Sequence, residues 1–559
     1  VSPQLIEADR NHYLLAISGT IRSKTLGVAF TDVSTGEFEV CEFRFDELTR
    51  FYDFVSLLQP REILLAQSRS EAETQFLEEL TKRILQLVSL GNSSESNENL
   101  EQLFNFLDPY QFDFDSAEKR LKTHFRTLNL AGFGIEGMPH AIASAGALLR
   151  YLEDTQKCSL VHFNTIRRHR FEESMLLDES SVVNLELFDN QSGQRQHTLY
   201  AVVNRTLTPM GGRLLRQWLR QPLLDLDQVN QRLDAIDAFR GQFMLCGEFR
   251  ALLKMIQDLP RIMGRISLPV AGIADLVALR ESIQPLQTIP EFLKEFDTPL
   301  INQIRDDFDT LEELKGLLDE QLLEEPSNRL REGGFMAVGV SEELDEFRRI
   351  SQNTKQFLNE MLVREKQRTG IPSLKISFNK VFGYYMEVSN VHKDSVPEDY
   401  IRKQTLVNAE RYITQELKEF EEKILTAEER IGELEYSLFL ELKEQIMLQS
   451  QRLQKTASEI AVLDVLAGWA DLAEHMNYKR PVLRPMSAER MMVFRACRHP
   501  VIEQIDLGEA FVPNDLRLEQ SGNRIMLITG PNMAGKSTFM RPVALNVLMA
   551  QCGCFVPAD

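Results

Sequence analysis

The chain has 559 residues, of which 43% are hydrophobic and 26% charged, and its formal net charge is −20. At roughly 150 residues per domain, this length predicts about four domains. The composition lies near globular averages, which excludes a wholly disordered, collagen-like or disulfide-scaffold protein. The acidic balance excludes a global polycation, so any contact with nucleic acid must be a local patch or a clamp around the duplex.

The six cysteines are scattered, and only Cys552 and Cys554 are close together in the chain. A C-x-C pair without a nearby Cys or His pair lacks the spacing of a zinc site. We therefore predict reduced, buried thiols. No uncharged apolar run reaches 18 residues, so no membrane span is predicted.

The first 90 residues alternate strand-like and helix-like patterns, which predicts a small α/β unit. Residues 13–18 and 26–32 are predicted strands joined to a third by the turn Ser34-Thr35-Gly36, and 48–58 is a predicted helix. In the third strand the apolar alternation slips by one residue at Val40-Cys41, which predicts a β-bulge.

From 115 to 330 the apolar residues recur mostly with a helical period, so this part of the chain is predicted to be mostly helical. Glu332-Gly333-Gly334 interrupts that pattern. Two long helices are predicted, at 341–366 and from about 408 to 455, and the strand-like residues 371–407 lie between them. The second helix carries a heptad seam of apolar residues: Leu417, Phe420, Ile424, Ala427, Ile431, Leu434 and Leu438. This order predicts either an ordinary coiled-coil hairpin or a lever arm that carries a contact module at its β tip.

Near the C-terminus, 524–529 is predicted to be a buried strand that leads into G-x-x-x-x-G-K-[ST] and then a helix. Gly530 and Gly535 allow the backbone to point N–H groups at phosphate oxygens, and the helix N-terminus adds partial positive charge. We predict that Lys536 bridges the β and γ phosphates of a nucleoside triphosphate and that Ser537 ligates Mg²⁺. The predicted nucleotide-binding loop is Gly530, Pro531, Asn532, Met533, Ala534, Gly535, Lys536, Ser537 and Thr538.

Hydrolysis needs more than this loop, because an acidic residue on a second strand must hold Mg²⁺ and another group must orient water. Glu and Asp are absent from 539–558. We therefore assign no catalytic residue and expect little or no hydrolysis from the chain alone, so whether it is an enzyme stays open.

Residues 528–541, with the sequence ITGPNMAGKSTFMR, resemble the P-loop of the MutS DNA mismatch-repair ATPases. Other segments are similar to further parts of that family, and the resemblance spans essentially the whole chain. They are RHPV (498–501) with FVPN (511–514) for the ATPase entry, FGYY (382–385) and QTLVNAERY (404–412) for the clamp, TPMGGRLL (208–215) for the core, and DVSTG (32–36) for the connector.

The resemblance implies a multidomain protein with α/β and all-α parts. The expected domains are a ribonuclease-H-like connector at 1–165, a helical core and lever at 166–370, a β-rich clamp at 371–431, the returning lever at 432–481, and part of an ABC-type P-loop ATPase domain at 482–559.

By the same resemblance, the full protein is a dimeric ring that encircles DNA, finds mismatches, exchanges ADP for ATP, becomes a sliding clamp and recruits MutL. The implied cofactors are ATP or ADP with Mg²⁺. The implied partners are double-stranded DNA, a MutL-type repair protein and a second copy of the chain. The implied location is the cytoplasm, in association with the nucleoid.

When the family's functional residues are matched to this sequence one by one, Phe511 corresponds to an aromatic residue that stacks on adenine. The alternative is that Phe511 is a residue of the hydrophobic core. Asn532 matches a P-loop asparagine near the γ-phosphate, and Asn408 matches a clamp contact with backbone phosphate. Residues 375–411 hold six basic and five acidic residues, so this segment is no basic patch. The residues of this segment whose positive charge suits a DNA contact are Lys380, Lys393, Arg402 and Lys403. Each of them is also consistent with an ordinary solvated surface residue.

Three departures from the family pattern set further expectations. The mismatch-recognition domain with its Phe-x-Glu wedge is absent from the sequence, so we expect the chain as given not to discriminate mismatches. The sequence ends before the Mg²⁺ carboxylates and the dimer-completing segment, and it lacks an initial Met, as expected of a processed chain or a fragment. Pro542 stands where Gln is usual, and it predicts a kinked helix.

These observations leave three interpretations open. The leading one is a mismatch-repair ATPase seen without both ends. The second is a MutS-like recombination clamp without mismatch recognition, and the third is a non-enzymatic DNA-clamp scaffold with a vestigial P-loop.

Overall fold

In the computed structural model the chain forms two compact units. Unit 1 comprises Val1–Ala271, Ala278–Glu312 and Met447–Asp559, and unit 2 comprises Gly272–Val277 and Glu313–Ile446. The structure describes residues 7–91, 103–156, 160–190, 192–352, 354–379, 383–485, 487–505, 511–531 and 535–559.

Unit 1 begins with a six-stranded sheet in the order β5-β4-β1-β2-β3-β6. Its first three strands form an antiparallel meander, β4 runs parallel to β1, β5 parallel to β4, and β6 parallel to β3. The strands are β1 (Tyr13–Thr20), β2 (Thr25–Asp32), β3 (Glu37–Arg44), β4 (Glu62–Ala66), β5 (Phe104–Leu107) and β6 (Arg167–Arg168). The predicted strands and the predicted helix, α1 (Leu48–Leu58), are confirmed.

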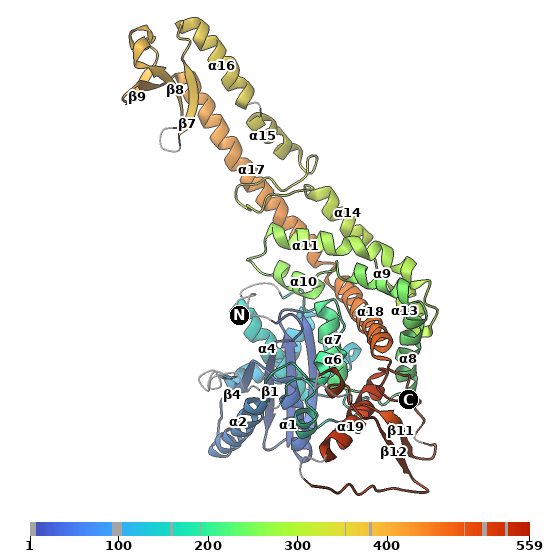
Figure 1. The fold of residues 1–559 in the computed structure, drawn as a ribbon. Coiled ribbons are helices and arrows are strands. Elements are labelled where there is room, and N and C mark those ends of the chain that lie inside the picture. Colours follow the sequence, from blue (N-terminus) through green and yellow to red (C-terminus); the bar gives the residue numbers. More distant parts are fainter. Residues whose placement is uncertain are drawn as a thin grey trace. The chain divides into compact units, whose positions relative to one another are not determined.

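Both faces of this sheet are buried, by α4 (Pro139–Gln156) on one face and by α1 and α2 (Glu71–Gly91) on the other (Figure 1). The predicted β-bulge is wrong, because the β2–β3 register runs unbroken from one end to the other. Val40 packs into the core on the α4 side, and Cys41 packs into the core on the α1 side. Successive side chains of a strand point to opposite faces, so two buried faces produce the apparent slip without an extra residue.

The remaining part of unit 1 is largely helical, as predicted for 115–330. At its centre α18 (Ser450–Met476) packs against α7 (Pro209–Arg220), α8, α9 and α10. The rings of Trp218 on α7 and Trp469 on α18 have centroids 5.5 Å apart. Further helices of unit 1 are α3 (Phe114–His124), α5 (Glu179–Asn184), α6 (Leu199–Val203), α8 (Leu226–Gly241), α9 (Phe243–Leu253), α10 (Leu259–Ser267), α12 (Ile289–Leu293) and α13 (Pro299–Asp307), and α11 (Ile273–Ile283) has residues in both units.

The TPMGGRLL segment joins α7 to α18 through one buried carboxylate. Asp464 on α18 is 0% exposed and accepts hydrogen bonds from the N–H and hydroxyl of Thr208, both at 2.7 Å, and from the N–H of Leu207 at 2.9 Å. Thr208 in turn caps α7, because its Oγ1 accepts the N–H of Gly211 at 3.0 Å. Burial raises the pKa of Asp464, and the hydrogen bonds from Thr208 act in the opposite direction.

Unit 2 contains a four-stranded antiparallel sheet in the order β7-β8-β10-β9 and the helices around it. The predicted strand-like segment is confirmed, and it continues to Ile413. The elements are α14 (Glu312–Gln321), α15 (Glu342–Gln352), α16 (Thr354–Thr369), β7 (Lys375–Asn379), β8 (Gly383–Ser389), β9 (Ile401–Thr405), β10 (Ala409–Ile413) and α17 (Gln415–Met447).

The predicted helix from about 408 to 455 is wrong at both ends. Residues 409–413 form β10, whose backbone pairs with β8 on one side and with β9 on the other. The helix starts only after Thr414, whose Oγ1 accepts the N–H of Leu417 at 3.2 Å, and it ends at Met447 before α18 begins at Ser450. Sheet pairing on both sides therefore overrides the helical period at 408–413.

The two long helices of unit 2 contact each other at the start of the predicted heptad seam, whereas further along α17 the buried positions include Glu435 and Phe439, which are not seam residues. The rings of Phe357 on α16 and Phe420 on α17 are stacked with centroids 3.8 Å apart. Met361 and Leu417 join the buried side chains under the sheet, among them Met386. This pairing supports the hairpin interpretation, and the lever-arm interpretation stays a prediction.

Five cysteines are free and buried: Cys41, Cys246, Cys497, Cys552 and Cys554. Cys158 lies outside the described residues. Burial raises the pKa of Cys552 to about 12, which keeps its thiol protonated at neutral pH. Among the residues described, none of the helices is long and apolar enough to span a membrane.

Candidate nucleotide site and clamp tip

The predicted phosphate loop leads into α19 (Lys536–Cys552), as the motif requires. Gly535 immediately precedes the helix with φ of 84°, a left-handed conformation that glycine adopts without a steric penalty. Because Gly535 has no side chain, it cannot cap the first N–H groups of α19. Those groups and the positive end of the helix dipole are suited to phosphate.

Lys536 folds back over this loop. Its Nζ donates to the carbonyl oxygens of Gly530 at 2.8 Å and Pro531 at 2.7 Å. The ammonium group is thus held beside the loop carbonyls, where the oxygens of a bound phosphate would compete for it. Ser537 is exposed on the first turn of α19, so its hydroxyl is accessible to a metal ion. These residues fit a nucleoside triphosphate with Mg²⁺, whereas Asn532, Met533 and Ala534 lie outside the described residues.

The predicted buried strand at 524–529 is wrong. The structure has no strand there, and Ile525 and Leu527 are 87% and 86% exposed. A strand needs a neighbour that shares its backbone hydrogen bonds. The preceding strands, β11 (Met491–Cys497) and β12 (Asn514–Glu519), form a sheet of two, and in the described chain no strand pairs with 524–529.

The RHPV and FVPN segments come together beside α19. The half-buried ring of Phe511 meets the ring of His499 edge-on, with centroids 6.5 Å apart. Burial, and secondly the charge of Arg541 on α19, lower the pKa of His499 to about 4. The side-chain amide of Asn546, also on α19, donates to the Arg498 carbonyl at 3.3 Å. The adenine-stacking role of Phe511 stays a prediction.

The far end of α19 is anchored in the core helices, which sequence reasoning missed. Arg232 donates to the Cys552 carbonyl at 2.7 Å, and the Cys552 thiol contacts the Trp218 carbonyl at 3.2 Å. Residues 232 and 552 are so far apart in the chain that no local motif signals this anchor. Pro542 lies inside the single helix α19, where the Asn546 amide donates to its carbonyl at 2.7 Å, and the predicted kink stays a prediction.

The turn between β9 and β10 presents Asn408 to solvent. The N–H of Asn390 donates to the Asn408 carbonyl at 3.2 Å, and the Asn390 amide donates to the Val407 carbonyl at 2.9 Å. Lys393 lies in the short helix that begins at Asn390 and is exposed. The structure therefore brings the predicted DNA contacts Asn408 and Lys393 to one end of the sheet.

The other predicted DNA contacts lie on the edge strand β9 or beyond the described residues. Arg402 and Lys403 are adjacent, so their side chains point to opposite faces of the sheet. Arg402 is paired with Glu410 at 3.4 Å, whereas Lys403 makes no ion pair with the part of the chain that the structure describes. Lys380 lies outside the described residues.

Comparison with known families and proteins gives consistent matches along the chain. The family model for MutS domain III matches residues 180–470, that for MutS domain II matches 12–164, and that for MutS domain V matches 526–559. The chain is 40% identical to a DNA mismatch repair protein MutS of Halothermothrix orenii, over 100% of this chain and 60% of that protein. A protein of the same name from Salinibacter ruber is 40% identical, and one from Syntrophobacter fumaroxidans is 41% identical, with coverage of 59% and 60% of their lengths.

The chain thus spans about 60% of the length of the curated relatives it matches. The match to MutS domain III alone covers more than half of the 559 residues. Together with the glycine, lysine and serine at the start of α19, these matches lead to one conclusion: the chain belongs to the MutS family.

Proposed function

We propose that the chain serves in DNA mismatch repair as part of an ATP-dependent clamp that binds mismatched duplex DNA and signals to downstream repair factors. The observation that carries this proposal is the identity of about 40% over the whole chain to relatives named as DNA mismatch repair proteins. The proposed partners are double-stranded DNA, a MutL-type repair protein and a second copy of the chain.

The architecture supports a finer division into family domains. The meander with two parallel strands, β4 and β5, suits a ribonuclease-H-like connector. The β7–β10 sheet suits a clamp, and α19 with its preceding loop suits the start of an ABC-type ATPase domain. The predicted boundaries at 165, 370, 431 and 481 are part of this proposal.

The proposed nucleotide is ATP or ADP with Mg²⁺, held by 530–538 with Phe511 against the base. In this site Lys536 would exchange its two carbonyl partners for phosphate oxygens, and Ser537 would be a metal ligand. Bound Mg²⁺ would supply neutralising charge beside the phosphates. These roles account for the residue types present, and the amount of hydrolysis that the chain supports alone is expected to be small.

Replacing Lys536 with alanine is expected to weaken ATP binding at least ten-fold, because charge-assisted hydrogen bonds contribute about 1.5–3 kcal/mol. Isothermal titration of the chain with Mg²⁺-ATP measures the change. Lys294→Ala is the matched control, because Lys294 is an exposed lysine paired with Glu291 on the surface. Unchanged affinity in Lys536→Ala would refute the assignment of the loop and favour a scaffold with a vestigial site.

DNA contact at the clamp tip predicts a smaller salt dependence in the double variant Asn408→Ala/Lys403→Ala. Loss of the Lys403 charge from a phosphate should reduce the slope of log K against log salt by about 0.9, whereas loss of the neutral Asn408 amide should weaken binding equally at every salt concentration. Duplex binding measured at four or more salt concentrations gives the slope. Arg402→Ala should have the smaller effect because Glu410 already shares its charge, and Lys418→Ala on α17 is the surface control. A slope equal to that of the unmodified chain would remove Lys403 from the site, and an unchanged affinity as well would remove Asn408.

A further inference from the structure

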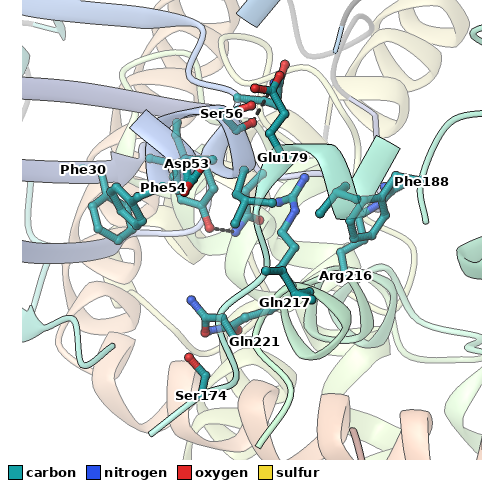
Figure 2. A pocket seen from close by; sticks show the side chains of 18 of the residues that line it. Phe30, Asp53, Phe54, Ser56, Ser174, Glu179, Phe188, Arg216, Gln217 and Gln221 are labelled. Carbon is teal, nitrogen blue, oxygen red and sulfur yellow. Dashed lines mark hydrogen bonds between the residues drawn. The ribbon is translucent and has the colours of Figure 1, made fainter. Parts of the chain in front are cut away.

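A cavity of about 740 Å³ lies inside unit 1, between the connector sheet and α7 (Figure 2). Its walls come from residues 9–13, the ends of β2 and β3, α1, residues 169–183 and α7. In Figure 2 Arg216 and Phe188 lie on one side and Phe30 and Phe54 on the other. The cavity is separate from the phosphate loop, and its lining residues have no role in the function proposed above.

One end of the cavity is rich in arginine. Arg216 is 3% exposed, and its Nη2 donates to Asp9 at 3.0 Å, while its Nε and Nη1 are buried without a hydrogen-bond partner. Arg220, one turn further along α7, has a buried Nε without a partner and lies 4.9 Å above the ring of Phe188. Among the described residues Arg220 makes no ion pair. Burial, and then the charge of Arg216, lower the pKa of Arg220 to about 10, so it remains charged at neutral pH.

The carboxylates around this end already have partners. Asp9 accepts from Arg216 and, at 2.8 Å, from the hydroxyl of Tyr200. Asp189 pairs with Arg10 at 3.6 Å. Neither carboxylate is ion-paired with Arg220, so its guanidinium is an unpaired cation that feels Asp189 only at longer range. Burying an unpaired cation is unfavourable, and an anion that entered the cavity would relieve this penalty.

The carboxylates elsewhere in the lining are also engaged. Glu39 pairs with His169 at 2.7 Å. Glu37 accepts from the amide of Asn11 at 2.8 Å and the hydroxyl of Tyr13 at 3.2 Å, and burial raises its pKa to about 8, so it is largely neutral at pH 7. On the α1 side, burial raises the pKa of both Asp53 and Glu179. Among the described residues, none of these carboxylates makes an ion pair with Arg220.

The opposite end of the cavity is aromatic. The rings of Phe54 and Phe30 have centroids 5.4 Å apart, and those of Phe54 and Phe171 are 5.3 Å apart, both edge-on. His169 adds a fourth ring, 4.6 Å from Phe171. The cavity therefore offers guanidinium donors at one end and ring surfaces at the other. Its volume lies within the usual range of small-molecule sites, about 300–1,000 Å³.

We propose that this cavity binds a small organic phosphate, with the phosphate group at Arg216 and Arg220 and the rest of the molecule toward Phe54. Guanidinium groups bind phosphate oxygens in a two-pronged geometry, and the buried Nε–H groups of both arginines supply donors for it. A ring-bearing ligand gains further contact with the aromatic wall. The site is a second ligand site of the chain, distinct from the phosphate loop before α19.

Thermal unfolding with adenosine 5′-monophosphate and with inorganic phosphate as probes tests this proposal, at ionic strength matched with NaCl. The nucleotide should raise the Tm of the unmodified chain more than inorganic phosphate does, and both should exceed NaCl. The shift should persist in Lys536→Ala and vanish in Arg220→Gln. Arg44→Gln is the matched control, because Arg44 is an arginine of the connector with a side chain that is 75% exposed.

Without ligand, Arg220→Gln should melt at or above the temperature of the unmodified chain, because the unpaired charge has gone. Isothermal titration should show at least ten-fold weaker binding of the nucleotide in Arg220→Gln. Binding should also be weaker in Arg220→Lys, which keeps the positive charge but lacks the two-pronged guanidinium group. A shift lost in Lys536→Ala and kept in Arg220→Gln would assign the ligand to the phosphate loop and overturn the proposal. A shift no larger than that of NaCl, or none at all, would overturn it as well.

Discussion

Replacing Gly211 with alanine is expected to lower the free energy of unfolding of unit 1 by about 2–4 kcal/mol. A Cβ at this position would lie 2.3 Å from Oδ2 of Asp464, closer than a Cβ can approach, and 3.0 Å from its Cγ. The carboxylate would have to move away from the N–H groups of Leu207 and Thr208 that it now accepts. The substitution would therefore combine overpacking with the loss of buried hydrogen bonds.

Urea unfolding followed by tryptophan fluorescence measures this effect where it occurs. The chain has two tryptophans, Trp218 and Trp469, and they lie on α7 and α18, the two helices that the substitution would push apart. Gly247→Ala on α9 is the matched control, since nothing lies within 4 Å of its added Cβ. That control should gain about 0.5–1 kcal/mol from its helix interior position. Equal midpoints for the two variants would contradict the close contact at Gly211.

Replacing Glu435 with alanine is expected to destabilise unit 2 by about 3–5 kcal/mol. Glu435 is 0% exposed on α17 and accepts the N–H groups of Gly334 at 3.1 Å, Phe335 at 2.9 Å and Met336 at 3.1 Å. It also accepts Nη2 of Arg348 at 2.9 Å. Its removal would leave three backbone donors without their acceptor, while Arg348 would keep only Asp345 and the carbonyls of Met336 and Ala337 as partners.

Hydrogen exchange read by mass spectrometry is the suitable measurement, because both tryptophans lie in unit 1. The amides of 334–336 should lose their protection, and α17 should exchange faster around position 435. Glu433→Ala is the matched control, because this glutamate has a side chain that is 59% exposed and pairs with Arg430 at the surface. Its effect should stay within about 0.5 kcal/mol. Amides 334–336 that remain as protected as in the unmodified chain would show that Glu435 does not hold them.

The sequence alone was sufficient where the deciding interactions are local. The helix at 48–58 follows from its apolar period, and strands β1, β2 and β3 follow from alternation and turn residues. The position of Gly535 and Lys536 at the start of α19 follows from a motif whose glycines and lysine have defined roles. These features depend on neighbours within a few residues, so pattern and propensity are adequate guides to them.

The tertiary structure decided features whose partners are distant in the chain. The apolar alternation slips at Val40-Cys41 although the strand has no bulge there, because helices from two other segments bury both faces of the sheet. Residues 409–413 form a strand because β8 and β9 pair with them. Residues 524–529 do not form a strand, because no described strand pairs with them.

The same holds for the buried polar groups. Asp464 meets Thr208 across 256 residues, and Arg216 and Arg220 converge on a cavity whose opposite wall comes from β2, β3 and α1. No local pattern specifies such contacts, since a carboxylate or an arginine on a helix is by itself equally compatible with solvent. What gives these side chains their roles is burial, which arises only when the segments pack together.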